Sequence, residues 1–383
     1  MIIGYDGKRA FQNKTGLGNY SRSLVSIMAS CFAQHQYILF APKQTSLFKT
    51  SADANLRIIT PKKFFYKKFP TLWRRAGMVK DIVDAGVDIY HGLSNELPRG
   101  IEKMPVKMVV TIHDLIFERF AETYNFDERY VHRWKIMQAC KNADAVIAIS
   151  KQTRDDLVNL YKIAPEKIFI CYQSCNPVFE MIQPAEKKAL IKKRYQLPDR
   201  YFLFVSSITP RKNLATICQA MILLKDELQI PLVIIGDGKN EKEKIKRLMQ
   251  RTGLQDQLIF LNELTVSKEN PFETGADFPA IYQQALALIY PSVFEGFGLP
   301  ILEALWSGLP VICSNTSSLP EVGGDAALYF APQDYALLAN HMKAIAGNES
   351  LVADLQLKGF EQVKKFTSGQ YAQSIMNVYG KVL

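Results

Sequence analysis

Two glutamates flank a glycine-rich turn near the C-terminal end of the sequence, in the run YPSVFEGFGLPILEA that covers residues 290–304. The residues before the turn, from Ala287 to Tyr290, have the composition of a short buried strand. Pro300 stands where the first turn of a helix tolerates proline. Glu295 therefore follows a strand end, and Glu303 lies in the opening turn of a helix. Both carboxylates are expected to face one pocket.

Backbone donors lie between these two carboxylates. Gly296 and Gly298 allow the main chain to approach a ligand closely, and the N–H groups around Gly298 and Leu299 point beyond the start of the helix. Acceptors at the ends and donors in the middle suit a polyhydroxyl ligand that carries phosphate. The pattern predicts a sugar-nucleotide site, and the alternative is a strand-turn-helix corner with two solvated glutamates.

A second turn carries two adjacent cations. After the expected strand 202–205, the sequence SSITPRKNL places Arg211 and Lys212 at the start of a helix. Cations at a helix N-terminus oppose the helix dipole unless an anion lies between them. The turn therefore predicts a diphosphate, and the alternative is a pair of surface charges that cap another loop.

Two further glycine turns follow strands. One contains Gly236, and the other, TGLGNY, contains Gly16 and Gly18. A Gly-x-Gly after a strand also occurs in dinucleotide-binding folds, but here Ser21 replaces the third glycine, and no acidic residue follows the second strand. The incomplete fingerprint disfavours a nicotinamide cofactor.

A histidine stands at the end of another expected strand. His113 follows the strand 108–112, at the position where open α/β sheets form their ligand crevice. A structural strand-end residue and a catalytic residue both fit this position. His91 ends a neighbouring strand and has the weaker case for the site.

Short apolar strands alternate with amphipathic helices along the whole chain, which predicts an α/β protein with two doubly wound parallel sheets. A proline-containing break near 176–184 separates two domains, 1–178 and 179–366, and the apolar stripe in 367–383 predicts a final helix. The expected strands are 2–5, 37–40, 88–90, 108–112, 145–149, 168–171, 202–205, 232–235, 258–261, 286–290, 311–314 and 327–330.

The stretch from Glu295 to Glu303, together with the following GLPVI, resembles the donor-site signature of the retaining glycosyltransferases of family 4, the group 1 glycosyltransferases, which have the GT-B fold. In that family the first glutamate contacts hydroxyls of the donor sugar, the second binds the nucleotide ribose, and the amides between them hold sugar and phosphate. The resemblance assigns the amide role to Phe297, Gly298 and Leu299.

The resemblance extends over essentially the whole chain and implies roles for the other turns. Lys212 would neutralise the donor diphosphate, and Arg211 would be the second cation because Ser206 and Ser207 replace the usual Gly-Arg pair. The final helix would pack back on the N-terminal domain. That domain would bind the acceptor, the C-terminal domain would bind the donor, and the two Rossmann-like domains would face each other across a cleft.

The family's remaining positions fall on three glycines and one histidine. Gly16 and Gly18 would reach the donor phosphate, Gly236 would lie near the nucleotide base, and His113 would face the donor sugar. Because the chain contains no Asp-x-Asp, no metal is expected to hold the diphosphate, and no cofactor is predicted.

Composition indicates a reduced, non-membrane-spanning protein. The six cysteines form no C-x-x-C pair, no apolar run approaches 18 residues, and the N-terminus begins directly as a strand without a charged leader. These features predict a cytoplasmic protein without a disulfide framework.

The net charge of +10 lies in the first half of the sequence. Much of it is local, in the segment 62–75, where basic and aromatic residues interleave. A solvated loop is one interpretation, an anionic membrane surface or lipid phosphate is another, and nucleic acid is not expected. The residues predicted to meet the membrane are Lys62, Lys63, Lys67, Lys68, Trp73, Arg74 and Arg75, with Phe64 and Phe65.

The sequence therefore predicts a retaining, metal-independent glycosyltransferase that moves a sugar from a nucleotide donor to a glycan or lipid-linked acceptor in cell-surface polysaccharide synthesis. Similar Pro-Arg-Lys-Asn turns in mannosyltransferases favour mannose. The alternatives are a sugar-nucleotide epimerase of the same fold, an NAD-dependent dehydrogenase and a non-enzymatic sugar-nucleotide sensor.

Overall fold

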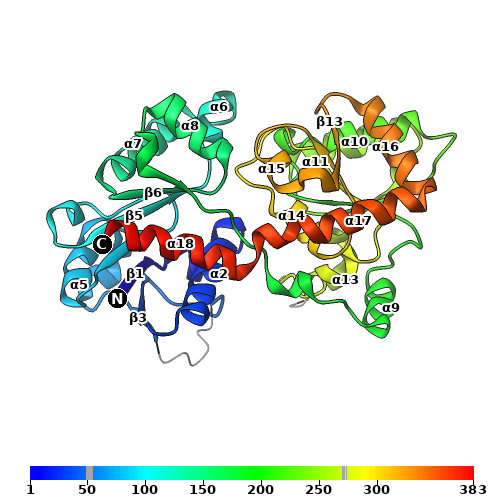
Figure 1. The fold of residues 1–383 in the computed structure, drawn as a ribbon. Coiled ribbons are helices and arrows are strands. Elements are labelled where there is room, and N and C mark those ends of the chain that lie inside the picture. Colours follow the sequence, from blue (N-terminus) through cyan, green and yellow to red (C-terminus); the bar gives the residue numbers. More distant parts are fainter. Residues whose placement is uncertain (49–54, 270–271, 273) are drawn as a thin grey trace. The chain divides into compact units, whose positions relative to one another are not determined.

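The computed structural model describes residues 1–48, 55–269, 272 and 274–383. The chain divides into two compact units, one formed by Met1–Gln173 with Ser368–Leu383 and the other by Ser174–Thr367. Each unit contains one parallel β-sheet with helices packed against it (Figure 1).

The first unit has a seven-stranded sheet in the order β3-β2-β1-β4-β5-β6-β7, and all of its strand pairs are parallel. Its strands are β1 (Ile2–Asp6), β2 (Gln36–Phe40), β3 (Leu56–Ile59), β4 (Ile89–Gly92), β5 (Lys107–Ile112), β6 (Ala145–Ala148) and β7 (Ile168–Ile170). Its helices before the last one are α1 (Lys8–Gln12), α2 (Gly16–Cys31), α3 (Phe64–Lys68), α4 (Pro70–Leu72), the π-helix Trp73–Gly77, α5 (Met78–Asp84), α6 (Ile116–Arg119), α7 (Phe126–Asn142) and α8 (Lys151–Tyr161).

The second unit has a six-stranded parallel sheet in the order β10-β9-β8-β11-β12-β13. Its strands are β8 (Phe202–Val205), β9 (Leu232–Ile235), β10 (Leu258–Phe260), β11 (Leu288–Tyr290), β12 (Val311–Ser314) and β13 (Ala327–Phe330). Its main helices are α9 (Ala185–Arg194), α10 (Leu214–Leu223), α11 (Asn240–Arg251), α13 (Phe278–Tyr282), α14 (Leu299–Trp306), α15 (Leu319–Gly323), α16 (Tyr335–Gly347) and α17 (Glu349–Val363).

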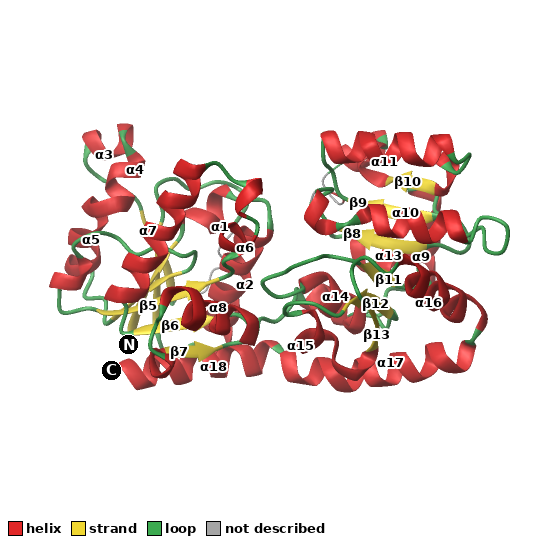
Figure 2. Ribbon diagram, turned by 90° about the horizontal axis from the view of Figure 1, so that it is seen from above, coloured by secondary structure: helices red, strands yellow, loops and turns green. Residues whose placement is uncertain are grey.

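Helices lie on both faces of each sheet, as Figure 2 shows. The central strands are therefore buried on both sides and consist of continuous apolar runs such as VICS in β12 and AVIA in β6, which is why the strands could be located in the sequence. β3 was not predicted. It is a four-residue edge strand, with the exposed Arg57 among its apolar residues.

Both sheets reverse their strand order once, between β1 and β4 in the first and between β8 and β11 in the second. At such a switch point the connections after neighbouring strands leave in opposite directions, which opens a crevice at the carboxyl ends of the strands. These two crevices are where ligand-binding side chains are expected.

The final helix, α18 (Ser368–Val382), belongs to the first unit and packs against α2 (Figure 1). Its Tyr379 hydroxyl is 2.7 Å from Nδ1 of His91, and Nε2 of that histidine is 2.8 Å from the hydroxyl of Thr111. His91 is fully buried with both ring nitrogens occupied. The histidine therefore serves to fix α18 on the sheet.

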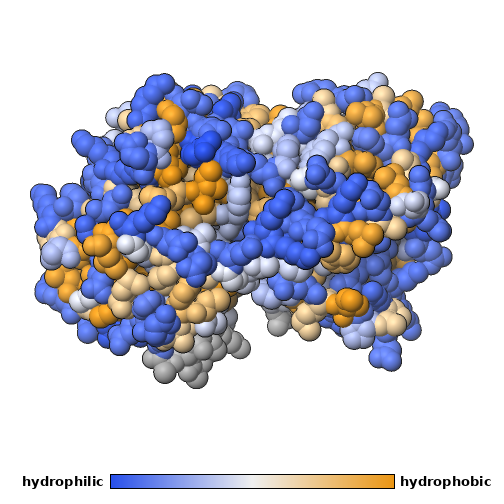
Figure 3. Space-filling view, in the orientation of Figure 1, coloured by the Kyte–Doolittle hydropathy of each residue, from blue (hydrophilic) through white to orange (hydrophobic). Residues whose placement is uncertain are grey.

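Polar side chains cover most of the face that Figure 3 shows, and apolar side chains form separate patches on it. Within the described residues, no helix combines the length and the apolar character needed to cross a bilayer.

Candidate active site

Two neighbouring strands of the second sheet end in the turns that carry the predicted cations and the first predicted carboxylate. β8 leads into a short 3-10 helix, Pro210–Lys212, and β11 leads into the turn 291–298. The amide of Val293 donates to the carbonyl of Arg211 at 2.9 Å, so the two turns are in direct contact. Because β8 and β11 pair in parallel, their carboxyl ends bring Lys212 and Glu295 to the same edge of the sheet.

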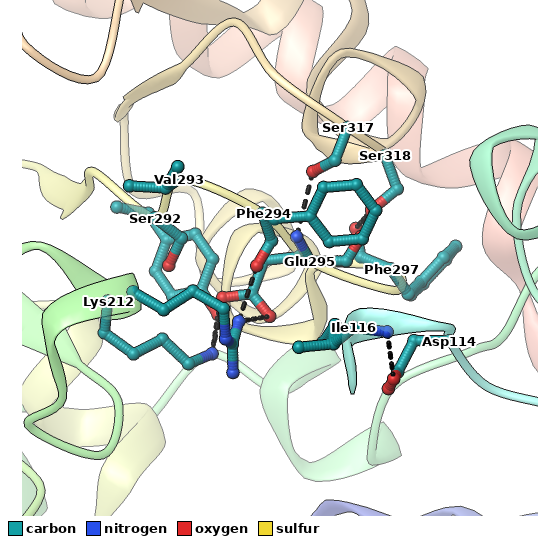
Figure 4. Close-up of polar contacts among 12 residues, drawn as sticks. Asp114, Ile116, Lys212, Ser292, Val293, Phe294, Glu295, Phe297, Ser317 and Ser318 are labelled. Carbon is teal, nitrogen blue, oxygen red and sulfur yellow. Dashed lines mark hydrogen bonds and ion pairs between the residues drawn. The ribbon is translucent and has the colours of Figure 1, made fainter. Parts of the chain in front are cut away.

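Glu295 binds both predicted cations with one buried carboxylate (Figure 4). The ammonium of Lys212 forms an ion pair with Oε1, and Nη1 of Arg211 lies 3.3 Å from Oε2. The Tyr290 hydroxyl donates to Oε1 at 3.0 Å and accepts from Nζ of Lys212 at 3.2 Å. The structure thus joins three residues that the sequence singled out to a tyrosine that it did not.

Electrostatics keep this carboxylate charged. Burial opposes the ionisation of Glu295, but the positive charges of Lys212 and Arg211 outweigh burial and hold its pKa below the ordinary value. Burial raises the pKa of the Tyr290 phenol, and the negative charge of Glu295 raises it further. Because the cluster joins one carboxylate to two basic side chains, it carries an excess of positive charge. Such an excess favours an anionic ligand.

Two serines hold the glycine-rich turn in place. The amide of Glu295 donates to Oγ of Ser317 at 2.9 Å, and the hydroxyl of Ser318 donates to the carbonyls of Glu295 and Phe297 at 3.0 and 2.6 Å (Figure 4). Gly298 has a φ of 123°, which a residue with a side chain rarely adopts. α14 begins at Leu299, so its first amides have no acceptor inside the helix and point towards the turn.

Phe297 does not present its side chain to a ligand. The ring is 4 % exposed and packs edge-on against Phe366, with the ring centroids 5.9 Å apart. Any ligand contact by this residue is therefore left to its backbone, which is the role that the family resemblance predicts.

Glu303 has a different environment from Glu295. Its Oε2 accepts a hydrogen bond from the Tyr282 hydroxyl at 2.9 Å, and no ion pair forms with it among the described residues. Burial raises the pKa of Glu303 to about 7, and the hydrogen bond from Tyr282 offsets only part of that rise. The carboxyl group therefore changes its charge near neutral pH.

The turn with Gly236 is explained by packing. A Cβ on Gly236, which has a φ of 152°, would lie 1.8 Å from the carbonyl oxygen of Ser206, and one on Gly238 would lie 2.1 Å from that of Ile208. The amide of Ile208 donates to the carbonyl of Asp237 at 2.8 Å. Glycine is thus required for the β9 turn to contact the β8 turn, and a role for Gly236 in donor binding stays a prediction.

The two glycines that open α2 differ from each other. A Cβ on Gly18 would lie 1.9 Å from the carbonyl oxygen of Asn13, so the loop geometry itself demands glycine there. A Cβ on Gly16 would meet nothing within 4 Å. Packing within the first unit therefore explains Gly18 and leaves Gly16 as the better candidate for close approach by a ligand.

His113 is buried at the end of β5. Its Nε2 lies 2.9 Å from the carbonyl oxygen of Leu93, its amide donates to Oδ1 of Asn95 at 3.1 Å, and its ring stands edge-on to Tyr20. Burial lowers its pKa to about 4, so the imidazole is neutral at physiological pH. Because a carbonyl can only accept, Nε2 carries the proton and Nδ1 is the nitrogen able to accept a hydrogen bond.

Two residues of the basic segment were assigned wrongly to its surface. Trp73 is fully buried and donates from Nε1 to Asp81 at 2.6 Å. Arg74 lies between Asp6 and Glu96, with a side chain that is 11 % exposed and Nη1 2.6 Å from the Glu96 carboxylate. Neither side chain can enter a membrane interface, because the π-helix turns both of them into the unit.

The sequence did not predict two further residues that contact the site. Asn213 adopts a φ of 58° and donates from Nδ2 to the carbonyls of Pro291 and Pro332, at 3.1 and 2.8 Å. It thereby ties the cationic turn to the glycine-rich one. An asparagine directly after Arg-Lys was a detectable signal, since asparagine is among the residues that tolerate a left-handed conformation. Ser317, by contrast, stands in no pattern that marks it as a partner of Glu295.

Two family profiles match the chain in succession. Residues 15–177 match the profile of "Glycosyltransferase Family 4", and residues 186–362 match that of "Glycosyl transferases group 1". The chain belongs to this family of glycosyltransferases, and the predictions of family, α/β fold and enzyme class are confirmed. The family assignment sets aside the dehydrogenase and epimerase interpretations.

Individual relatives place the chain more closely. It is 28 % identical over 386 residues to the O-antigen chain mannosyltransferase B of Escherichia coli, with 95 % of this chain and 96 % of the relative covered. It is 31 % identical over 319 residues to the serotype-specific mannosyltransferase WbdA of E. coli, with 80 % of this chain covered, and it spans 38 % of that longer protein. The crystal structure of Anabaena Alr3699/HepE in complex with UDP and glucose superposes with a TM-score of 0.73 at 15 % identity, covering 99 % of both chains.

Proposed function

We propose that this glycosyltransferase moves a sugar, with mannose as the first candidate, from a nucleotide-sugar donor to a glycan or lipid-linked acceptor in cell-surface polysaccharide synthesis. The observation that carries the donor assignment is the cluster of Arg211 and Lys212 around Glu295 at the switch point of the second sheet. A nucleoside diphosphate matches this excess of positive charge. The mannosyltransferase relatives support mannose and a polysaccharide product.

In this proposal the residues of the cluster have different roles. Arg211 and Lys212 bind the diphosphate and stabilise the charge that develops on the leaving group, a task that cations at a fixed position perform without reorganisation. Glu295 accepts hydrogen bonds from the donor sugar, and releases its two cations to the diphosphate as it does so. The amides of Gly298 and Leu299 supply further donors to the sugar and phosphate.

Three other residues complete the proposed donor site. Glu303 accepts hydrogen bonds from ribose hydroxyls, as its counterpart does in the family. Gly16 admits a phosphate close to the backbone, and Nδ1 of the neutral His113 accepts a hydrogen bond from the donor sugar. We propose, as for the family, that the anomeric configuration is retained, with the departing phosphate helping to deprotonate the acceptor hydroxyl.

A panel of nucleotide sugars tests the donor assignment. The full-length protein is mixed with GDP-mannose, UDP-glucose and related donors, and the melting temperature is measured for each. A donor present at 100 times its dissociation constant should stabilise the protein by roughly 2.7 kcal/mol. The donor with the largest shift is then supplied with a mannose-terminated acceptor, and product is detected by mass spectrometry. If no nucleotide sugar changes the melting temperature or yields product, the proposal is wrong.

We also propose that the first unit docks on an anionic membrane surface, so that the enzyme is cytoplasmic and peripheral. Lys62, Lys63, Lys67 and Lys68 are exposed, as is Arg75. Among them stand exposed apolar residues, of which Phe64 is 82 % and Phe65 56 % exposed. Basic side chains beside exposed aromatic ones are the combination that binds anionic lipid and enters the interface.

A second exposed apolar stripe supports this surface. Phe126, Tyr130, Trp134 and Met137 follow one another at helical spacing on α7, and all four are exposed. Arg99 connects the stripe to the basic segment, because its guanidinium lies 4.7 Å from the Trp134 ring and its amide donates to the carbonyl of Arg75 at 2.7 Å. Arg99 therefore contacts both the apolar stripe and the end of the basic segment.

Vesicle sedimentation tests the membrane proposal. Replacing Lys62, Lys63, Lys67 and Lys68 with glutamine should abolish binding to phosphatidylglycerol vesicles, since each lysine contributes about 1 kcal/mol near an anionic surface. Binding of the parent should fall as salt rises beyond about 0.15 M, where the Debye length is about 8 Å.

The matched control for this test replaces four exposed lysines of the second unit, Lys193, Lys225, Lys268 and Lys364. This control variant should sediment as the parent does. Equal loss in both quadruple variants would indicate an unspecific effect of net charge, and no loss in either would return the segment 62–75 to a solvated loop.

A further inference from the structure

Two cations at the carboxyl end of β1 form no ion pair with any carboxylate that the structure describes. Lys8 and Arg9 directly follow the strand and its Gly7, and both side chains are half-buried. Within the part of the chain that the structure describes, neither forms an ion pair, and Nε of Arg9 is buried without a hydrogen-bond acceptor. A buried donor left unpaired costs free energy, so native proteins rarely keep one without a reason.

The nearby carboxylates are already occupied. Asp6 accepts from Nε of Arg74 at 3.0 Å and from the backbone amide of Lys8 at 3.0 Å. Glu96 binds Nη1 of Arg74 at 2.6 Å and Nζ of Lys135 at 2.8 Å. Both carboxylates therefore already bind other donors, and they attract the Lys8 ammonium only without direct contact.

The two cations lie at the switch point of the first sheet, where open α/β sheets form their ligand crevice. β1 and β4 are the strands between which the first sheet reverses its order, and Lys8 and Arg9 follow the carboxyl end of β1. Burial lowers the pKa of Lys8, and repulsion from Arg74 and Arg9 lowers it further. The cations therefore repel one another, and an anion placed among them would relieve that repulsion.

We infer that Lys8 and Arg9 bind a phosphate group of the acceptor at the switch point of the first sheet. The inference rests on the proposed function, which requires an acceptor. Arginine suits the task because its planar guanidinium donates two parallel hydrogen bonds to a phosphate, and the lysine adds a second charge. A phosphate or diphosphate that links a saccharide to a lipid is the acceptor chemistry that matches this pair.

The test compares two acceptors that differ only in charge. One carries a mannose-terminated disaccharide on an alkyl chain through a diphosphate, and the other carries the same disaccharide on the same chain through an ether. The variants are Lys8→Gln with Arg9→Gln, the charge-retaining Arg9→Lys, and the control Lys103→Gln, which removes an exposed lysine of the same unit.

The double variant should raise the KM for the diphosphate acceptor at least tenfold more than the KM for the ether acceptor. Arg9→Lys should recover part of that difference, and Lys103→Gln should change neither KM. Equal KM changes for the two acceptors would overturn the inference. If the double variant instead weakens the affinity for the free nucleotide, the inference is also overturned, because Lys8 and Arg9 would then bind the donor.

A binding experiment separates this inference from the proposed function. Inorganic pyrophosphate is titrated into the full chain carrying Lys212→Ala, which weakens the donor site, and binding is followed by 31P NMR. Binding that survives Lys212→Ala and disappears on adding Lys8→Gln and Arg9→Gln supports the site even if no sugar transfer is ever detected. Binding that is unchanged by the added substitutions contradicts it.

Discussion

At the switch point of the first sheet one partly buried arginine binds two carboxylates, whereas at that of the second sheet one buried carboxylate binds two cations. Arg74 is held by Asp6 and Glu96, and Glu295 is held by Arg211 and Lys212. The first arrangement leaves no charge for a ligand on Arg74 itself, while the second leaves an excess of positive charge. The same types of side chain therefore neutralise Arg74 in the first unit and leave a net positive cluster around Glu295 in the second.

Arg74→Met should have the largest effect, and it should be on stability. Burial opposes the charge of Arg74, but Asp6 and Glu96 outweigh burial and raise its pKa. The substitution would leave the buried Asp6 without its ion-pair partner and Glu96 with Lys135 alone, which costs about 3–5 kcal/mol of unfolding free energy. Urea denaturation measures this loss. Arg75→Met, at the adjacent exposed arginine, is the matched control. An equal loss of stability in both variants would show that Arg74 is not a structural anchor.

Lys212→Ala should act on binding instead of stability. The lysine is proposed to donate a charge-assisted hydrogen bond to the diphosphate, so its loss should weaken donor affinity by about 1.5–3 kcal/mol. Isothermal titration with the nucleotide sugar measures this change. Lys225→Ala, an exposed lysine just beyond the other end of α10, should leave the affinity unaltered. Equal affinity in the Lys212 variant and the parent would end the assignment.

Glu295→Gln should separate turnover from nucleotide binding. Without the carboxylate charge, the positive charges of Lys212 and Arg211 can still attract diphosphate, so affinity for the free nucleotide should not fall. The rate of sugar transfer should drop by about 10- to 100-fold, or 1.4–2.7 kcal/mol, because the donor sugar loses its charged acceptor. Steady-state kinetics and nucleotide titration together measure the two quantities. A parallel loss of both would show that the division of roles is wrong.

Glu303→Gln should change the pH dependence of stability. The pKa of Glu303 in the folded protein, about 7, lies above its unfolded value, so the folded state binds more protons between roughly pH 4.5 and 7. This group's contribution therefore lowers stability as pH rises through that window, by about 3 kcal/mol, and stays constant above it. Thermal unfolding from pH 5 to 8 should show a smaller decline in the glutamine variant. Parallel curves would refute the raised pKa.

Glu303→Gln should also weaken free-nucleotide binding, whereas Glu295→Gln should spare it. The contrast follows from the proposed ribose contact of Glu303, whose only ordered partner among the described residues is Tyr282. Titration of both variants with the same nucleotide measures the two affinities. Identical affinities would show that Glu303 does not contact the ribose.

What the sequence could predict depends on whether the signal was local. Apolar runs located the buried strands, and the positions of Glu295, Arg211 and Lys212 after neighbouring strands predicted that these residues would lie together. The prediction that Trp73 and Arg74 lie on the surface was wrong because both residues stand in a continuous basic-aromatic run. Only the fold brings Arg74 to Asp6, 68 residues away in the sequence. The partnership of Glu303 with Tyr282 and that of Glu295 with Ser317 depend on packing in the same way, so no spacing rule could have found them.

The smallest expected effect is that of EDTA, which should leave sugar transfer unchanged. Enzymes that bind a diphosphate through a metal need carboxylates to hold that metal, and this sequence has no Asp-x-Asp. In the proposed function the charge of the leaving group is instead met by Arg211 and Lys212, which chelation does not remove. Transfer is measured in excess EDTA and again after magnesium or manganese is restored. If activity disappears and returns with the metal, the two cations of the second switch point are insufficient, and the contrast between the two units does not account for catalysis.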